Sequence, residues 1–197
     1  MSTLKVQVIL GSTREGRYGD KPASWIVEKL KTTPGIETEL VDLRDWPLPF
    51  FNEPMSPAMS KGDYKNDLAK KWAAKVAEAD AYVIVTPEYN HGYPAVLKNA
   101  LDWVYYEWNK KPVAFVSYGG AGGARSVEQL RQVVAELQMV SMRESVHILW
   151  DLYMATMKEQ VPPNPELFKP VDQKADNMIA ELKWWGSALK TARESAS

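Results

Sequence analysis

Short apolar runs alternate along the chain with segments of helical periodicity, and this alternation constrains the fold more than any other feature. The predicted strands are residues 4–10, 37–43, 81–86, 112–118 and 145–150. Continuous apolar runs such as AYVIVT and PVAFVSY are typical of parallel strands whose two faces are both buried. Strands that are separated by helices connect through right-handed crossovers. We therefore predict an α/β fold with a doubly wound, five-stranded parallel sheet.

The segments between the predicted strands place apolar side chains at helical spacing. The predicted helices are residues 22–30, the stretch around 68–76, a stretch that Pro94 opens, the stretch around 127–137, and the tail from Val171. Asp20 is the expected cap of the first helix. Residues 44–65 hold four prolines, so this segment is predicted to be a long surface loop without regular structure.

Two strand orders suit such a chain, and one of them is 2-1-3-4-5. In either order, a ligand lies at the carboxyl ends of the strands beside the point where the order reverses. For the order 2-1-3-4-5, this point lies at the loops after the first and third strands, with the loop after the fourth beside them. The unusual residues of the chain fall in these loops, which are 11–19, 87–94 and 117–125.

The charge balance and the missing cysteines exclude several classes of function. The net charge is −1, so we expect no nucleic-acid partner, and the strongly acidic surface of an electron carrier is not indicated. A chain without cysteine has no disulfide, no thiolate nucleophile and no cysteine-bound metal. Its two histidines, His91 and His147, are far apart, so we expect no metal site.

Length and hydropathy predict the setting of the protein. The 197 residues are expected to form a single domain, residues 1–197. No stretch approaches the ~18 apolar residues that a membrane span requires, and the first residues lack the pattern of a signal peptide. We therefore predict a cytoplasmic protein that has no membrane partner.

The first loop, residues 11–19, reads GSTREGRYG. Gly11 and Gly16 have the spacing of a P-loop, but the lysine and hydroxyl residue that complete this motif are absent, so a triphosphate site is not expected. Glycines and a helix N-terminus can still direct N–H groups at an anion. We predict a monophosphate site with hydroxyl and guanidinium donors from Ser12, Thr13, Arg14 and Arg17. The alternative is a glycine turn with solvated arginines.

The second loop, residues 87–94, reads PEYNHGYP. Its prolines restrict the backbone, its tyrosines offer flat faces, and its asparagine supplies both a donor and an acceptor. We predict that this loop borders a planar heterocycle. The alternative is that Tyr89 and Tyr93 pack under the loop while Asn90 caps backbone groups. Glu88 and His91 are expected to be solvated or ion-paired.

The third loop, residues 117–125, holds four of the eleven glycines of the chain. The pattern Gly120-x-Gly122 matches the start of a dinucleotide-binding fingerprint, but Arg125 stands at the third glycine position, so the fingerprint is not complete. Glycines packed this densely let the backbone approach a flat ligand and direct N–H groups at its polar edge. The alternative is a flexible loop that binds no ligand.

The segments GSTREGRYG, TPEYNHGYPAVLKNALDW and SYGGAGGARSVEQLR, in this order and spacing, resemble the NADPH-dependent FMN reductase family of flavodoxin-like proteins. The resemblance covers residues 4 to 150 and implies a flavodoxin-like three-layer sandwich whose five-stranded parallel sheet has the order 2-1-3-4-5. It also implies FMN as cofactor and NADPH or NADH as electron donor. It implies phosphate contacts from Ser12, Thr13, Arg14 and Arg17. It also implies ring contacts from Pro87, Glu88, Tyr89, Asn90, Ser117, Gly119, Gly120, Gly122 and Gly123.

A ping-pong mechanism is expected from the resemblance. Hydride passes from NAD(P)H to the flavin, which then reduces a small-molecule electron acceptor: a quinone, an azo compound, a metal oxyanion or free flavin. The protein supplies orientation and electrostatics, so we assign no catalytic residue. Two alternatives remain: a flavodoxin-type electron-transfer protein, against which the net charge of −1 argues, and a cofactor-free interaction domain.

Two aromatic side chains of the helix that begins at Pro94 lie away from its core stripe, and we use them to predict an oligomer. The core stripe of the helix is Leu97, Leu101, Val104 and Trp108. Trp103 and Tyr106 lie well away from this stripe, and exposed Trp and Tyr are favoured anchors of interfaces. We therefore predict a homodimer or homotetramer, as the resemblance to dimeric and tetrameric reductases also implies. The alternative is that the Pro-rich loop of the same chain covers both rings.

Overall fold

The computed structural model describes residues 3–195 and contains a parallel sheet in the predicted order. The strands are β1 Leu4–Leu10, β2 Ile36–Asp42, β3 Ala81–Pro87, β4 Pro112–Tyr118, β5 Val140–Ser141 and β6 Val146–Ile148. The order is β2-β1-β3-β4-β5, with β6 also paired to β4, and every strand pair is parallel. The predicted α/β class and the order 2-1-3-4-5 are confirmed.

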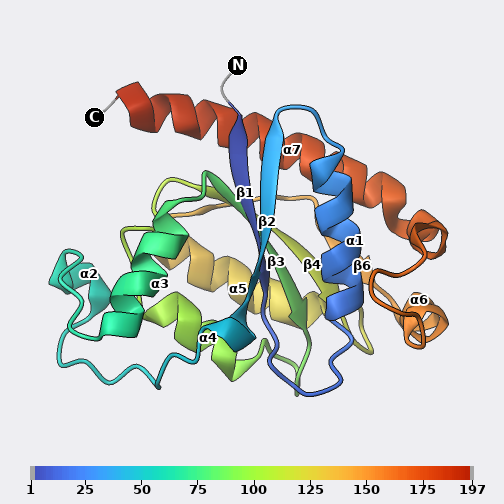
Figure 1. Ribbon diagram of the computed structural model, residues 1–197, viewed down its shortest axis with the longest axis horizontal. Helices are drawn as coiled ribbons and strands as arrows, with labels where there is room; N and C mark the ends of the chain where they lie inside the picture. The colour runs from blue at the N-terminus through green and yellow to red at the C-terminus, as the bar shows by residue number, and fades with distance from the viewer. Residues whose placement is uncertain (1–2, 196–197) are drawn as a thin grey trace.

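Helices cover both faces of this sheet (Figure 1). They are α1 Asp20–Lys31, α2 Pro57–Ser60, α3 Asp67–Ala77, α4 Ala95–Asp102, α5 Ala124–Glu136, α6 Trp150–Thr156 and α7 Lys169–Ser195, with 3₁₀ turns η1 Leu43–Asp45 and η2 Pro165–Phe168. One core packs α1 and α7 against the sheet, and the other packs α3, α4 and α5. The result is the predicted three-layer sandwich.

The fifth strand differs most from its prediction. It consists of two short segments, β5 and β6, which both pair with β4, and Trp150 begins helix α6 instead of ending a strand. The segment 44–65 also contains η1 and α2, so it is not wholly irregular. In the described part of the chain, no helix is long and apolar enough to cross a membrane.

Trp103 is buried, which contradicts the prediction that it lies on an exposed aromatic face. Only 1 % of the residue is accessible, because the Pro-rich loop covers it. Its indole N–H donates to the carbonyl of Pro49 at 2.7 Å, and its ring meets that of Phe51 edge to face. Tyr106 remains 45 % exposed, although its hydroxyl donates to the carbonyl of Ala58.

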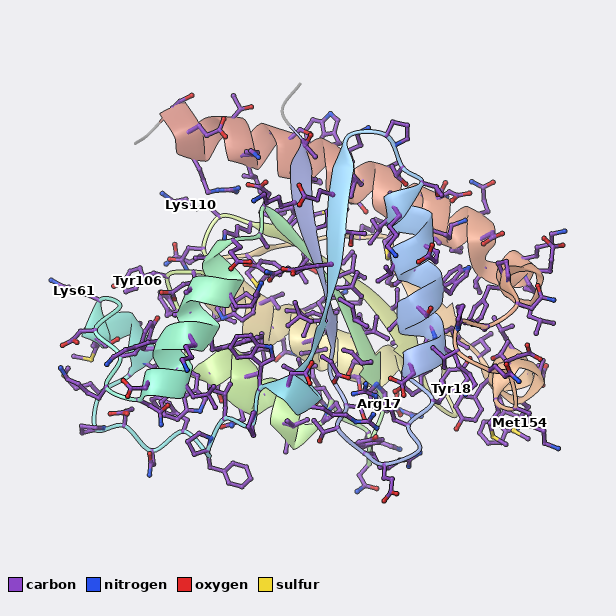
Figure 2. All side chains as sticks on the ribbon, viewed as in Figure 1. Arg17, Tyr18, Lys61, Tyr106, Lys110 and Met154 are labelled. Carbon is purple, nitrogen blue, oxygen red and sulfur yellow. The ribbon has the colours of Figure 1, made fainter. Side chains whose placement is uncertain are left out.

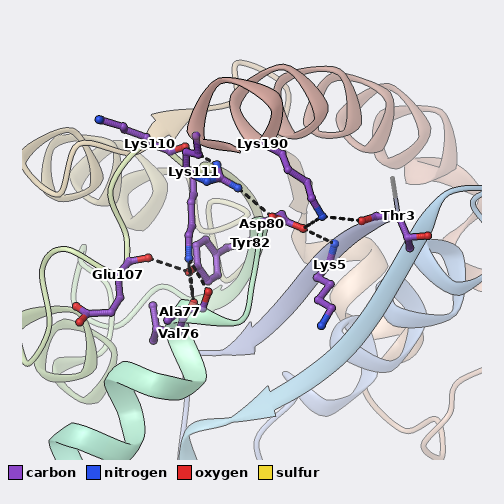
Figure 3. A network of polar contacts seen from close by, with 11 residues as sticks. Thr3, Lys5, Val76, Ala77, Asp80, Tyr82, Glu107, Lys110, Lys111 and Lys190 are labelled. Carbon is purple, nitrogen blue, oxygen red and sulfur yellow. Dashed lines mark hydrogen bonds and ion pairs between the residues drawn. The ribbon is translucent and has the colours of Figure 1, made fainter. Parts of the chain in front are cut away.

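A polar network at the amino ends of the strands joins α7 to the sheet (Figure 3). The carboxylate of Asp80 accepts hydrogen bonds from the backbone N–H of Lys5, from Lys190 Nζ at 2.8 Å and from Arg193 at 2.9 Å. Beside it, Lys111 is buried and donates to backbone carbonyls at the end of α3. Burial lowers the pKa of Lys111 to about 8. This network lies at the edge opposite the three predicted ligand loops.

Candidate functional site

The three loops predicted to bind a ligand meet at the carboxyl ends of β1, β3 and β4, along the lower edge of Figure 1. The Ser12 hydroxyl lies 2.8 Å from that of Tyr89, which joins the first loop to the second. The Glu88 carboxylate accepts hydrogen bonds from the backbone N–H and the guanidinium of Arg125, which joins the second loop to the third. Parallel pairing therefore brings together segments more than a hundred residues apart.

Arg17 holds the first loop in place from inside the protein. Its side chain is only 2 % exposed. Its Nε donates to Asp20 at 2.9 Å, Nη1 donates to Asp42 at 2.7 Å and to the Ser12 carbonyl, and Nη2 donates to both carboxylates. Burial lowers the pKa of Arg17, but hydrogen bonds with Asp42 and Asp20 outweigh burial and raise it overall.

All five N–H groups of Arg17 are therefore used within the protein. The predicted contact between Arg17 and a phosphate has no free donor in the structure, because Asp42 at the end of β2, Asp20 at the start of α1 and the Ser12 carbonyl accept from all of them. Asp20, expected as a helix cap, makes no capping hydrogen bond and instead pairs with Arg17. Arg17 and Tyr18 lie side by side at the start of α1 (Figure 2).

The remaining donors of the first loop are free to meet an anion. Thr13 and Arg14 are exposed. Within residues 3–195, the hydrogen bonds of the protein do not use the backbone N–H groups of Thr13, Glu15, Gly16 and Gly19. These groups precede the first turn of α1, where the helix dipole also favours negative charge. Of the predicted side-chain donors, Thr13 and Arg14 are therefore accessible, whereas Ser12 is buried with its hydroxyl against Tyr89.

A buried tyrosine hydroxyl faces this loop, and the sequence analysis missed it. Tyr118 ends β4, is 5 % exposed, and its Oη makes no hydrogen bond to the described residues. A methyl group added at Gly19 would lie 2.6 Å from that oxygen, so the hydroxyl points at the first loop. Burial raises the pKa of Tyr118 above its ordinary value, which keeps the hydroxyl a donor. An aromatic residue at the carboxyl end of a central strand was the available sequence signal.

The second loop is a tight turn. The backbone groups of Tyr89 and Gly92 bond reciprocally at 2.8 and 3.0 Å, and the two residues between them, Asn90 and His91, both have positive φ. The guanidinium of Arg14 lies 5.8 Å from the centre of the Tyr89 ring. Tyr93, in contrast, packs against the core, as the alternative reading proposed for both tyrosines.

The other two predicted residues of the second loop have partners within the protein. Pro87 ends β3, and its carbonyl accepts from the Ser126 hydroxyl at 2.8 Å. The side chain of Glu88 is buried and ion-paired with Arg125, as expected. Pro87 and Glu88 therefore form the rigid wall of the site, while Tyr89 and Asn90 lie at its more accessible side.

The third loop rests on Ser117. The Ser117 hydroxyl donates to the Gly122 carbonyl at 2.7 Å. Gly123 has a φ of +75°, and a methyl group there would lie 2.6 Å from the Ser117 side chain, so only glycine fits. At Gly120, the same addition would meet no atom within 4 Å, so this part of the loop is open.

The open side of the third loop also presents backbone donors. In the part of the chain that the structure covers, the N–H groups of Gly120, Ala121 and Gly123 make no hydrogen bond. Gly119 has a φ of +148°, and a methyl group added there would lie 3.2 Å from the Glu88 side chain. A glycine at this position therefore lets the second and third loops approach closely. A loop with unpaired N–H groups suits a flat ligand whose edge carries acceptors.

Comparisons with known proteins agree with this geometry. The family described as NADPH-dependent FMN reductase matches residues 4–149. An NAD(P)H-dependent FMN reductase of Schizosaccharomyces pombe is 47 % identical over 137 residues, which are 70 % of this chain and 68 % of that protein. An NAD(P)H-dependent FMN reductase of a Nectria species is 39 % identical over 194 residues, 94 % of this chain and 89 % of that protein.

Among solved structures, the flavoenzyme NAD(P)H:(acceptor) oxidoreductase of Paracoccus denitrificans has the same fold. Its TM-score is 0.72, its identity is 23 %, and the match covers 94 % of this chain and 98 % of that one. At this level of identity, the likeness supports the flavodoxin-like architecture alone.

Proposed function

The chain belongs to the NADPH-dependent FMN reductase family, and from this premise we propose that the three-loop site binds FMN and serves electron transfer from NADPH or NADH to a small-molecule acceptor. The family uses NAD(P)H and FMN, and the protein is an oxidoreductase. The unpaired hydroxyl of Tyr118 is the observation that carries the assignment of the site. A buried donor without a partner costs free energy unless a ligand accepts its hydrogen bond.

The first loop is proposed to hold the phosphate of FMN. Ser12, Thr13 and Arg14 supply side-chain donors, and the unpaired backbone N–H groups before α1 supply the rest. Arg17 acts differently in this proposal: it fixes the path of the loop through Asp20 and Asp42.

The second and third loops are proposed to border the flavin ring. Pro87, Glu88, Tyr89 and Asn90 form one side, and the other side is formed by Ser117, Gly119, Gly120, Gly122 and Gly123. Bound FMN supplies the hydride chemistry, while the protein orients the reactants. The unpaired N–H groups of Gly120 and Ala121 stabilise negative charge at the ring edge that they face.

We infer a ping-pong order in which donor and acceptor bind in turn beside Gly120, where the third loop is open. A quinone, an azo compound, a metal oxyanion and free flavin all remain candidate acceptors. No side chain is required to transfer a proton, and we assign no catalytic residue.

The test begins with the protein reconstituted with FMN. We expect flavin absorption bands that persist after gel filtration, disappear when NADPH or NADH is added without oxygen, and return when a quinone is added. Protein that shows no flavin bands after reconstitution would contradict the site. A flavin that exchanges electrons with a reductase but never oxidises NAD(P)H would instead indicate an electron carrier of the flavodoxin type.

We also propose a homodimer or homotetramer that associates through the Pro-rich loop. The proposal now rests on exposed side chains of this loop and no longer on Trp103. Phe50 is 79 % exposed, and Met55 and Met59 of the same loop are exposed, as is Tyr106, whose hydroxyl contacts this loop at Ala58. Exposed apolar side chains that gather on one surface are typical of an interface. Trp103 supports this surface from below but does not belong to it.

A further inference from the structure

His147 reaches the underside of the third loop from the middle of β6. Its Nδ1 atom lies 2.9 Å from Ser117 Oγ and 3.3 Å from the carbonyl oxygen of Gly122. On the other edge of the ring, Nε2 lies 2.8 Å from the hydroxyl of Ser145. The imidazole therefore spans the distance between Ser145 and the base of the glycine loop.

These contacts favour one tautomer of the imidazole. Ser117 has a single hydroxyl proton, and it donates this proton to the Gly122 carbonyl at 2.7 Å. Both atoms that Nδ1 approaches are then acceptors, an arrangement that favours a proton on Nδ1. Nε2 of the neutral ring consequently accepts from Ser145.

The imidazole contacts the part of the third loop whose backbone conformation favours glycine. Gly122 and Gly123 both have positive φ, and the backbone of Gly123 packs directly on Ser117. The N–H groups of Gly120 and Ala121, in the same loop, make no hydrogen bond to the described residues. Fixing Gly122 from below thus sets the direction of the donors that the ligand meets above.

We propose that His147 is a positioning residue for the flavin ring, whose Nδ1–H holds Ser117 and Gly122 so that the glycine loop is already arranged for the flavin before binding. The inference rests on the proposed function, because the loop is assigned to the ring there. Preorganisation of this kind contributes to affinity, since the loop loses less freedom when the ligand binds.

The surroundings keep the ring neutral. Burial lowers the pKa of His147, the Gly122 carbonyl raises it, and Arg131 on α5 lowers it. Arg143, Glu144 and Ser145 before β6 and Lys174 on α7 line a cavity of about 320 Å³ that His147 shares. Burial and the charge of Arg131 outweigh the Gly122 carbonyl, so the uncharged imidazole is favoured at neutral pH.

Two substitutions separate the hydrogen bond from the volume of the ring. The amide nitrogen of asparagine can take the place of Nδ1, whereas leucine fills similar space without a donor. We expect His147→Leu to weaken the binding of FMN and of riboflavin equally, by roughly tenfold, the loss of about one hydrogen bond. We expect His147→Asn to restore both affinities to within about threefold of the wild type.

Riboflavin lacks the phosphate, so a comparison of its affinity with that of FMN shows whether His147 acts on the ring or on the phosphate. A loss for FMN alone would place the effect at the phosphate and overturn the inference. Equal affinity in the wild type and His147→Leu would overturn it as well. A wild-type protein that binds neither flavin would instead contradict the proposed function, and the inference would then be decided on the flavin-free protein.

Two further measurements test the proposal on the flavin-free protein. Nitrogen-15 NMR of the imidazoles should show neutral His147 protonated at Nδ1, and His91→Gln assigns the signals because the chain has only two histidines. Amide hydrogen exchange at Gly122 and Gly123 should be faster in His147→Leu than in His147→Asn. Protonation at Nε2, or exchange that is the same in both variants, would overturn the proposal even if His147→Leu folds poorly.

Discussion

Arg17 and Asp42 form a two-point ion pair that ties the first loop to the end of β2. Nη1 and Nη2 of the guanidinium each donate to a different oxygen of the carboxylate, and Asp20 accepts from the same side chain. Arg17 and Asp42 are 25 residues apart and meet because β1 and β2 are parallel neighbours. The pair determines the path of the first loop, and Arg14 is left to meet a ligand.

Arg17→Ala is expected to destabilise the protein. Removing the guanidinium leaves the Asp20 and Asp42 carboxylates without their partner, and breaking a buried pair in this way costs roughly 3 kcal/mol. Chemical denaturation should show a lower free energy of unfolding. Arg14→Ala is the matched control and should unfold like the wild type, because Arg14 is exposed. Equal stability of Arg17→Ala and the wild type would contradict the stabilising role of this ion pair.

Arg14→Ala should act on ligand binding instead. We expect FMN binding to weaken by about 1.5–3 kcal/mol, the contribution of a charged hydrogen bond, which is ten- to a hundredfold in affinity. Riboflavin should bind almost as tightly to the variant as to the wild type. Fluorescence titration with both flavins measures the difference. If both affinities fell together, Arg14 would not contact the phosphate.

Tyr118→Phe should have opposite effects on the free and the bound protein. The substitution removes a buried hydroxyl that has no hydrogen bond to the described residues, so the flavin-free protein should gain about 1 kcal/mol of stability. FMN binding should weaken roughly tenfold, because the ligand loses a donor. Melting temperatures measured with and without FMN test both statements. An unchanged FMN affinity would show that the hydroxyl does not face the ligand.

The stability of the protein should rise with pH through the titration of Lys111. Burial lowers the pKa of Lys111 to about 8 in the folded protein, whereas the unfolded chain keeps the value of 10.5. Between these two values the unfolded state binds more protons, so the free energy of unfolding increases with pH. We expect a gain of about 1 kcal/mol between pH 7 and pH 9 from this group. Lys111→Met should lack this rise in urea unfolding, and a rise of the same size in the variant would assign it to another group.

Phe50→Glu combined with Met59→Glu should reduce the assembly to a smaller particle. Both side chains are exposed on the Pro-rich loop, so the charges should disturb an interface without disturbing the fold. Light scattering at micromolar concentration measures the mass. Trp103→Glu is not a suitable probe, because it would place a charge in the core. A wild-type protein that is already monomeric and fully active would contradict the proposed assembly.

The sequence by itself determined the class of fold and the three loops, and the resemblance to a known family implied the strand order. Residues 4–10 and 112–118 were predicted as strands with the same bounds that β1 and β4 have. Apolar periodicity reports local burial, and parallel connectivity then requires that the loops after β1, β3 and β4 share one edge. These properties are encoded within segments of ten to twenty residues, so they can be read without the tertiary structure.

The tertiary structure decided which side chains face a ligand and which serve the protein. Arg14 and Arg17 are equivalent in the sequence, but Asp42 lies beside only one of them in the folded chain. Trp103 lies away from the core stripe of its predicted helix, but residues about 50 positions away bury it. The roles of Tyr118 and His147 likewise depend on partners from other elements. Hydrogen bonds and ion pairs between distant segments follow from how the crossovers place those segments, and no local periodicity contains that information.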